Sequence, residues 1–261
     1  MPTARRSVPC LVPLMAALTA LLCAVTYLLG GFPTGRAKAV PDTDTPADAP
    51  LVEDESAPPI RCVVIDAGHG GEDGGASSAS GVVEKEINLA VALALRDLFE
   101  AAGIPVVMTR TEDVLLYDRN VDFKGRKKVL DLAARRLVAE RTAEAAAKDG
   151  GTSLFISIHM NAFPQPQYSG MQVWYGTDAA ASQEIAFAIQ TASAALMPDN
   201  HRKIKAAGSN LYLLDRIKTP AVLVECGFLS NPEEALRLSD PRYRHALAVL
   251  IFSAAVPYVT P

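Results

Sequence analysis

Two histidines and two glutamates occupy positions where they could bind a metal and move a proton. His69, His159 and Glu225 each follow a short apolar run, and Glu84 begins a segment with helical periodicity. Two neutral imidazoles and one carboxylate, with a fourth position left open, form a catalytic zinc set. The residue types and their placement therefore predict a zinc site that performs hydrolysis.

A hydrolytic zinc site needs two kinds of carboxylate. Zinc lowers the pKa of a bound water to about 7. A second carboxylate, off the metal, can then accept a proton and later deliver it to the leaving group. Spacing alone does not decide which of Glu84 and Glu225 is the ligand and which is the base.

The histidines and the Gly-rich stretch also have simpler interpretations. A single histidine at a strand end is more often structural than a ligand, but two on separate strands with a glutamate on a third favour a site. The Gly-rich stretch 68–75 could instead cradle a phosphate. It is neither a G-x-G-x-x-G arrangement nor a P-loop, because no Gly-Lys-Ser/Thr follows it.

From residue 60 onward, strand and helix signals alternate along the chain. Compact apolar runs predict strands, and periodic segments predict helices. The expected strands are 61–66, 105–108, 154–158, 171–175 and 221–225, and the expected helices are 84–102, 131–147, 181–196 and 245–256. This order predicts an α/β fold: a mostly parallel twisted sheet with helices on both faces and the active site at the C-terminal strand edge.

The first 59 residues differ from the rest. Arg5 and Arg6 precede an uncharged stretch, 7–34, so residues 1–32 are predicted to be a signal anchor or a signal peptide. The apolar run is long enough to cross a bilayer, which favours retention as a membrane anchor, although Ala37-Lys38-Ala39 could be a cleavage site. Residues 33–59 read as a flexible linker and 60–261 as the catalytic domain, which either alternative places outside the cytoplasm.

Charge and composition limit the partners. The net charge is −4, with 25 Lys and Arg against 29 Asp and Glu, so the sequence gives no reason to expect nucleic acid as a partner. Hydrophobic residues make up 49% of the chain, which is typical of a globular protein rather than a disordered one.

Four segments resemble, in family order, the motifs of the zinc-dependent N-acetylmuramoyl-L-alanine amidases of type 3. The matching segments are residues 64–76, 83–89, 154–162 and 221–232, and the resemblance covers about residue 60 to the C-terminus. Departures are small: Ala67 stands where proline is usual, and Cys226 replaces an apolar residue.

The resemblance assigns roles that spacing left open. It implies that His69, Glu84 and His159 hold zinc and that Glu225 is the catalytic base. The implied reaction is hydrolysis of the amide between the lactyl group of N-acetylmuramic acid and the first L-alanine of the stem peptide, so the implied partner is peptidoglycan.

Two residues are candidate substrate contacts. Arg110 follows the expected strand 105–108 and could meet a substrate carboxylate, although a solvated arginine is an equally good interpretation. Asn161 stands two positions after His159, inside the third motif. Both residues are predicted to contact the substrate.

A narrower resemblance concerns residues 109–136 and 202–213. These segments are similar to the germination-specific amidases of spore-forming bacteria, which implies action on spore cortex, where removal of stem peptides precedes formation of muramic δ-lactam. The expected location is then the membrane, the cell wall or the cortex. A regulatory protein partner is an open alternative that no motif supports.

Two other functions remain as alternatives. One is a catalytically silent scaffold that binds the cell wall, which should have lost a ligand or the base, whereas all four residues are present. The other is a zinc peptidase that cuts a different peptidoglycan amide. Identification of the reaction products separates the peptidase from the amidase.

Overall fold

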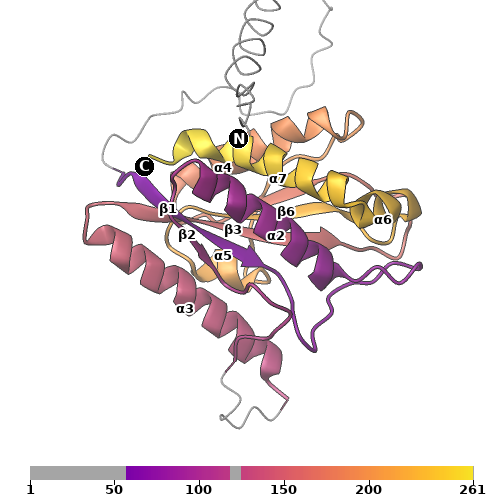
Figure 1. The fold of residues 1–261 in the computed structure, drawn as a ribbon, viewed down its shortest axis with the longest axis horizontal. Helices are drawn as coiled ribbons and strands as arrows, with labels where there is room; N and C mark the ends of the chain where they lie inside the picture. The colour runs from indigo at the N-terminus through magenta and orange to yellow at the C-terminus, as the bar shows by residue number, and fades with distance from the viewer. Residues whose placement is uncertain (1–56, 118–124, 261) are drawn as a thin grey trace, which may run out of the picture. The chain divides into compact units, whose positions relative to one another are not determined.

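A central sheet organises the molecule. The computed structural model describes residues 57–117 and 125–260, within a compact unit that runs from Asp54 to Pro261. In the described residues the sheet has six strands in the order β2-β1-β3-β6-β4-β5 (Figure 1). The strands are β1 (Ile60–Ala67), β2 (Val106–Met108), β3 (Thr152–Asn161), β4 (Gln172–Tyr175), β5 (Lys205–Ala206) and β6 (Ala221–Phe228).

The predicted mostly parallel sheet is confirmed, with one reversal. β1 pairs in parallel with β2 and β3, and β3 pairs in parallel with β6. β4 runs antiparallel to β6, and β5 is parallel to β4. Gln172, which begins β4, pairs with Glu225 near the carboxyl end of β6. The chain leaves β3 at this edge and re-enters the sheet at the same edge without a crossover helix, so β4 must run backwards.

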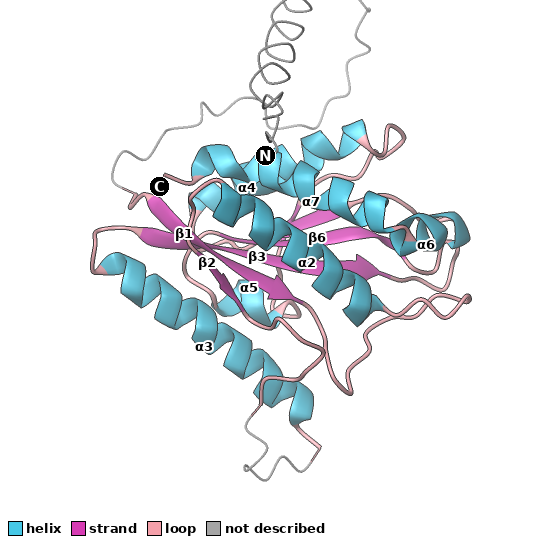
Figure 2. Ribbon diagram, in the orientation of Figure 1, coloured by secondary structure: helices cyan, strands magenta, loops and turns pink. Residues whose placement is uncertain are grey.

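Helices cover both faces of the sheet, as predicted (Figure 2). They are α2 (Glu84–Ala101), α3 (Lys127–Ala147), α4 (Ala180–Ala192), α5 (Tyr212–Arg216), α6 (Pro232–Ser239) and α7 (Pro241–Ala255), with short 3-10 turns at Ser193–Ala195 and Val256–Tyr258. α2, α4 and α7 pack together on one face, whereas α3 and the short α5 lie on the other.

The two faces carry different side chains because successive residues of a strand point to opposite sides. In β3, Ile156 and Ile158 belong to the large apolar core under α2, α4 and α7, whereas Phe155 belongs to the smaller core under α3 and α5. By the same alternation His159, two positions beyond Ser157, faces α3 and α5. Since α5 has only five residues, this face is incompletely covered near the strand ends.

Helix starts account for most differences from the predicted elements. α7 begins at Pro241 rather than at residue 245, because the Asp240 side chain accepts a hydrogen bond from the backbone N–H of Arg242 and proline suits the first turn. Asn231 and Pro232 begin α6 in the same way, and α6 had not been expected. α5 is too short for helical periodicity to reveal it.

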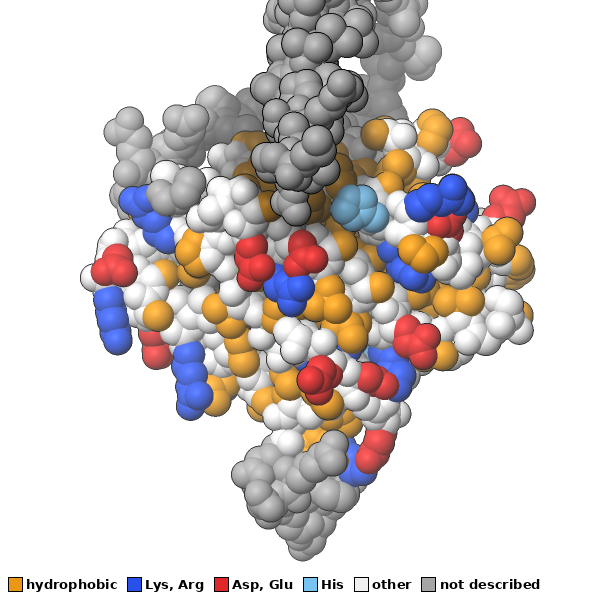
Figure 3. All heavy atoms as spheres, in the orientation of Figure 1, with side chains coloured by type: hydrophobic (Ala, Val, Ile, Leu, Met, Phe, Trp, Pro, Cys, Tyr) orange, Lys and Arg blue, Asp and Glu red, His pale blue; other side chains and the backbone are white. Residues whose placement is uncertain are grey.

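The predicted N-terminal anchor, 1–32, and most of the linker 33–59 lie outside the described residues. Among the helices of the described part, none has the length and apolarity needed to span a membrane. On the face that carries α2, α7 and α3, acidic and basic side chains are interspersed, so this face does not carry charge of a single sign (Figure 3).

Candidate metal centre and active site

Three of the predicted residues converge to form a potential metal site. The Nε2 atom of His69 lies 3.2 Å from Oε1 of Glu84, and Nδ1 of His159 lies 3.1 Å from the same oxygen. One ligand atom from each residue can be chosen so that all lie within 4.8 Å of one another. They come from the loop after β1, the first turn of α2 and β3, so tertiary structure rather than local sequence assembles the set.

The spacing of these atoms fits a small tetrahedral ion. Zinc ligands at about 2.0–2.1 Å from a tetrahedral centre lie roughly 3.3 Å from one another. The two nitrogen–oxygen distances, 3.2 and 3.1 Å, are close to this value. Two imidazoles with one carboxylate are also the donor types of a catalytic zinc site. The residues present therefore fit such an ion.

Glu84 is held firmly in place. Its Oε2 accepts a hydrogen bond from the backbone N–H of Ala76 at 2.7 Å, and its Oε1 accepts from the backbone N–H of Met160 at 3.1 Å. Burial would raise the pKa of Glu84, but the hydrogen bonds from His159 and His69 outweigh it and hold the pKa far below its ordinary value. The carboxylate is thus charged and oriented toward both imidazoles.

Two glycines of the first motif make room for these side chains. A Cβ on Gly75 would lie closer than 3.0 Å to the carboxylate of Glu84, and φ at Gly75 is +68°. A Cβ on Gly68 would lie closer than 3.0 Å to the ring of His159. The Gly-rich stretch therefore lets the backbone approach the ligands closely, which replaces the phosphate-cradle interpretation.

His69 occupies an unusual backbone conformation. Its φ is +61°, in the left-handed region, which costs a non-glycine residue on the order of 1–2 kcal/mol. Its carbonyl accepts a hydrogen bond from Nη2 of Arg135 at 2.6 Å. Its Nδ1 lies 2.9 Å from Oδ2 of Asp73, which leaves Nε2 directed at Glu84. A carboxylate behind a ligating imidazole orients the ring and raises its basicity.

Two buried arginines fix the backbone of this loop. Arg135 donates to the carbonyls of Ala67 and His69, and Arg110 donates to the carbonyls of Ala67 and Gly68. Three consecutive carbonyls therefore accept hydrogen bonds from cationic side chains. Charge-assisted hydrogen bonds are the stronger kind, so the loop is restrained where it carries the candidate ligand His69.

Arg110 does not have the position expected of a substrate contact. It is 3% exposed, and its guanidinium also donates to the carbonyls of Glu112 and Lys85. We therefore interpret Arg110 as a positioning residue, and the predicted contact with a substrate carboxylate has no support in this arrangement. Asn161 lies at the end of β3, part-buried, where its Oδ1 accepts from the backbone N–H of Ala162; its contact with substrate stays a prediction.

A buried charge network lies beneath the site. Asp66, at the end of β1, accepts hydrogen bonds from Arg135 at 2.7 Å, from Thr109 at 2.7 Å and from Ser157 at 2.6 Å. Burial would raise the pKa of Asp66, but Arg135 and the two hydroxyls together lower it. Arg135 also donates to Asp131 at 2.7 Å. Sequence reasoning missed this network, although Asp66 stands out as a charged residue that ends an apolar strand.

Glu225 lies beside the three candidate ligands without joining them. It pairs with His159 in the register of β3 and β6. The residue as a whole is part-exposed, but its Oε2 is buried and makes no hydrogen bond with the described residues. Burial, together with the negative charge of Glu84, raises the pKa of Glu225 to about 7, although both histidines act in the opposite direction. A carboxylate with such a pKa suits proton transfer near neutral pH.

Comparison with known proteins places this geometry in a family. Residues 63–256 match the family model described as N-acetylmuramoyl-L-alanine amidase. The germination-specific N-acetylmuramoyl-L-alanine amidase of Bacillus subtilis strain 168 is 35% identical over 201 residues, which are 77% of this chain and 80% of that protein. The amidase LytC of the same strain is 30% identical over 219 residues, covering 82% of this chain and 39% of that protein.

Solved structures agree with the fold. The CwlD amidase from Clostridioides difficile, determined in complex with the GerS lipoprotein, superposes with a TM-score of 0.68 at 36% identity and covers 76% of this chain and 98% of that chain. The catalytic domain of CwlV, an N-acetylmuramoyl-L-alanine amidase from Bacillus (Paenibacillus) polymyxa var. colistinus, gives a TM-score of 0.62 at 29% identity, over 76% and 98% of the two chains.

Proposed function

Because this chain belongs to the N-acetylmuramoyl-L-alanine amidase family, we propose that it uses zinc to hydrolyse the amide between the lactyl group of N-acetylmuramic acid and L-alanine. The enzyme class itself follows from the family: the chain is an N-acetylmuramoyl-L-alanine amidase, and its substrate is peptidoglycan. The observation that carries the zinc proposal is the convergence of His69, Glu84 and His159 beside Glu225.

The residues divide into holding and proton-transfer roles. His69, Glu84 and His159 would hold the ion, which when bound supplies a Lewis acid and a water of lowered pKa. Glu225 accepts a proton from the attacking water and delivers it to the departing amine of L-alanine. Its raised pKa supports both halves of this role, because a carboxyl with a pKa near 7 both accepts and donates a proton at neutral pH.

Substitution of two residues tests these roles. Glu225→Ala should abolish turnover while zinc remains bound, because the residue lies outside the ligand set. His69→Ala should lose the metal as well as activity. Metal analysis of the purified variants measures bound zinc, and mass spectrometry of digested peptidoglycan measures turnover. An active Glu225→Ala variant, or a His69→Ala variant with stoichiometric zinc, would contradict the assignments.

The same digestion decides between the remaining functions. Free stem peptides that begin with L-alanine identify the amidase reaction. A zinc peptidase would release shorter fragments and leave L-alanine on the glycan. A silent scaffold would bind peptidoglycan and release nothing.

We further propose that the substrate in the cell is spore cortex and that the enzyme acts in germination through the formation of muramic δ-lactam. Similarity to the germination-specific amidase of Bacillus subtilis and to CwlD supports this narrower function. Deletion of the gene in the native host should remove muramic δ-lactam from purified cortex. Normal δ-lactam in the deletion strain would contradict the cortex role and leave the amidase reaction intact.

The cellular context follows as a proposal. Peptidoglycan lies outside the cytoplasmic membrane, so we place the catalytic domain outside it, tethered by residues 1–32 or released after their cleavage. CwlD was determined in complex with a lipoprotein, and we propose that this chain also has a regulatory protein partner. Affinity capture of the full chain from sporulating cells, followed by reconstitution with the captured protein, tests this; an unchanged rate would contradict it.

A further inference from the structure

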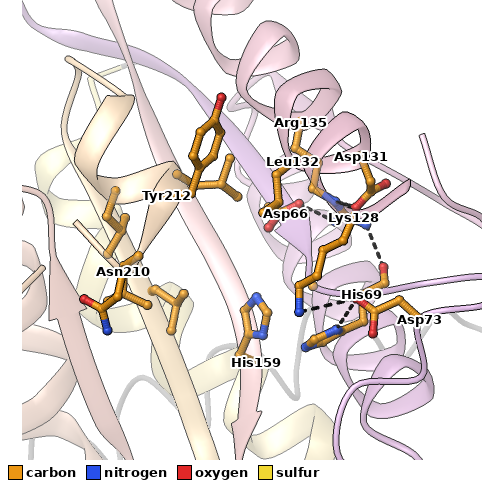
Figure 4. A pocket seen from close by; sticks show the side chains of 15 residues that line it. Asp66, His69, Asp73, Lys128, Asp131, Leu132, Arg135, His159, Asn210 and Tyr212 are labelled. Atoms are coloured by element: carbon orange, nitrogen blue, oxygen red, sulfur yellow. Dashed lines mark hydrogen bonds and ion pairs between the residues drawn. The ribbon is translucent and has the colours of Figure 1, made fainter. Parts of the chain in front are cut away.

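A small cavity opens beside the candidate ligands on the face of α3 and α5 (Figure 4). Its volume is about 180 Å³, and its walls include His69 and His159. Its apolar walls come mainly from Leu132, Leu211, Leu213, Leu214 and Leu223, and polar residues such as Asp73, Asp131 and Asn210 also line it. Pockets for drug-sized ligands measure roughly 300–1,000 Å³, so this cavity suits a short apolar group rather than a disaccharide.

The charged groups around the cavity differ in burial and in pairing. Arg135 pairs with Asp66 and Asp131, and all three are buried. Lys128, at the mouth, differs because 69% of its side chain is exposed and its Nζ lies 4.0 Å from Oδ2 of Asp73. Figure 4 shows the Lys128 ammonium extending from α3 toward His69. The cavity thus combines an apolar floor with an accessible cation at its mouth.

We propose that this cavity receives the peptide side of the scissile amide, with the leucines against the methyl group of L-alanine and Lys128 binding the free carboxylate of the next residue. This inference rests on the proposed function and deepens it. L-alanine is bonded directly to the reacting carbonyl, so it must lie next to the ligands. The Cα of the following residue lies about 3.8 Å further along the chain. The Nζ of Lys128 is on the same side as His69, because it lies 4.0 Å from Oδ2 of Asp73, which is 2.9 Å from Nδ1 of His69.

The glycan side of the substrate fits this cavity poorly. Sugar hydroxyls placed against the leucine side chains would lose hydrogen bonds to water that leucine cannot replace, which is unfavourable. An alanyl methyl group gains from the same burial. The carboxylate of the second residue meets a cation that is not committed to a buried ion pair. Chemistry therefore favours the peptide over the sugar as the occupant.

A matched pair of substrates tests the lysine contact. Synthetic muramoyl peptides carry either a free α-carboxylate on the second residue (γ-D-glutamyl) or the corresponding amide (D-isoglutaminyl). The zinc-loaded wild-type enzyme should favour the free carboxylate by about five- to ten-fold in kcat/KM, mainly through KM, as expected for one exposed charge-assisted contact. In Lys128→Gln this ratio should fall toward one.

The control is Lys148→Gln, which removes an exposed lysine from the other end of α3 and should keep the wild-type ratio. An unchanged ratio in Lys128→Gln, or no preference in the wild type, would overturn the proposal. If Lys128 only supported Asp73 and His69, its substitution would lower kcat/KM equally for both substrates and would weaken zinc binding. Absence of turnover on either substrate would instead count against the proposed function.

Binding without turnover gives a second readout. In a Glu225→Gln background, calorimetry with the released peptides should show five- to ten-fold weaker binding of the amidated peptide, and Lys128→Gln should remove that difference. Replacement of L-alanine by L-serine should also weaken binding about three- to ten-fold, because its hydroxyl would be buried against leucine. Equal binding of the alanyl and seryl peptides would overturn the proposal that the leucines contact the methyl group of L-alanine.

Discussion

Gly68 packs against the imidazole of His159 so closely that a Cβ on residue 68 would come within 3.0 Å of three ring atoms. Gly68→Ala should therefore displace the ring from the other ligands. We expect zinc affinity to fall at least 10–100-fold, the range seen when groups that orient ligands are altered. Titration against a fluorescent zinc chelator measures this loss.

The control for this substitution lies in the same loop. A Cβ on Gly74 would meet only a side-chain atom of Val83 at an ordinary 3.4 Å, and φ at Gly74 is not in the left-handed region. Gly74→Ala should bind zinc like the wild type. Wild-type affinity in Gly68→Ala would show that the ring adjusts without cost and that Gly68 does not set its position.

Arg135 stabilises the fold beneath the site as well as the loop that bears His69. Arg135→Met leaves Asp66 and Asp131 charged and buried, so the free energy of unfolding should fall by about 3–5 kcal/mol. Urea denaturation of the zinc-free protein measures this change. The double variant Asp66→Asn/Arg135→Met should be more stable than the sum of the two single effects predicts, because it removes both partners. Strict additivity would contradict the coupling.

Site residues could be predicted from the sequence where their position next to a strand is recognisable in the local pattern. They could not be predicted where the local pattern is unremarkable. His159 and Glu225 were found because each follows an apolar strand, and parallel strands end at one edge. Glu84 could be assigned as a ligand only through family resemblance, since spacing cannot bring the start of a helix to 3.1 Å from a particular ring.

Other parts of the site could not be predicted in this way. Arg135 sits in a helix rich in alanine, arginine and glutamate, where nothing in the sequence distinguishes the buried Arg135 from the less buried Arg136 and Arg141. Arg110 was expected to meet substrate, because a strand end does not reveal that nearby backbone carbonyls will occupy a guanidinium. The reversed direction of β4 depends on how the 162–171 connection turns, which periodicity does not encode.

Removal of the metal should lower thermal stability. The three candidate ligands belong to separate elements, so an ion that binds all three would stabilise only the folded state. At a zinc concentration 100-fold above Kd the stabilisation is about 2.7 kcal/mol, which corresponds to roughly 5–10 °C in Tm for a domain of this size. Thermal melts with and without EDTA should differ by this amount. His69→Ala should show little response to EDTA, and an equal response would indicate a metal elsewhere.

The raised pKa of Glu225 should make its carboxylate destabilising to the fold at neutral pH. Its ordinary pKa of 4.5 is raised to about 7 in the folded state, so folding favours the protonated form. The contribution of Glu225 to stability is therefore most favourable below about pH 4.5 and declines as pH rises toward 7. The shift corresponds to at most about 3 kcal/mol, and part-exposure of the residue reduces this to about 1–2 kcal/mol.

Glu225→Gln removes that penalty. In zinc-free protein the variant should be more stable than the wild type by about 1–2 kcal/mol at pH 8 and nearly equal at pH 4.5. Urea denaturation at the two pH values compares them. A variant less stable than the wild type at pH 8 would show that the carboxylate is well solvated rather than buried.

The pH dependence of turnover should report Glu225 as a base. The group must be ionised to accept a proton, so kcat/KM should rise with pH through the pKa of Glu225 and then level off. Burial places this pKa at about 7, and a bound cation would lower it, so the acidic limb should lie at or below about pH 7 with unit slope. Profiles from pH 5 to 9 measure the limb. As a control, His245→Gln removes an exposed imidazole on α7 and should leave the acidic limb at the same pH. A profile that falls between pH 5 and 7 would exclude Glu225 as the base, because a carboxylate that must first lose its proton cannot become less active as the pH rises.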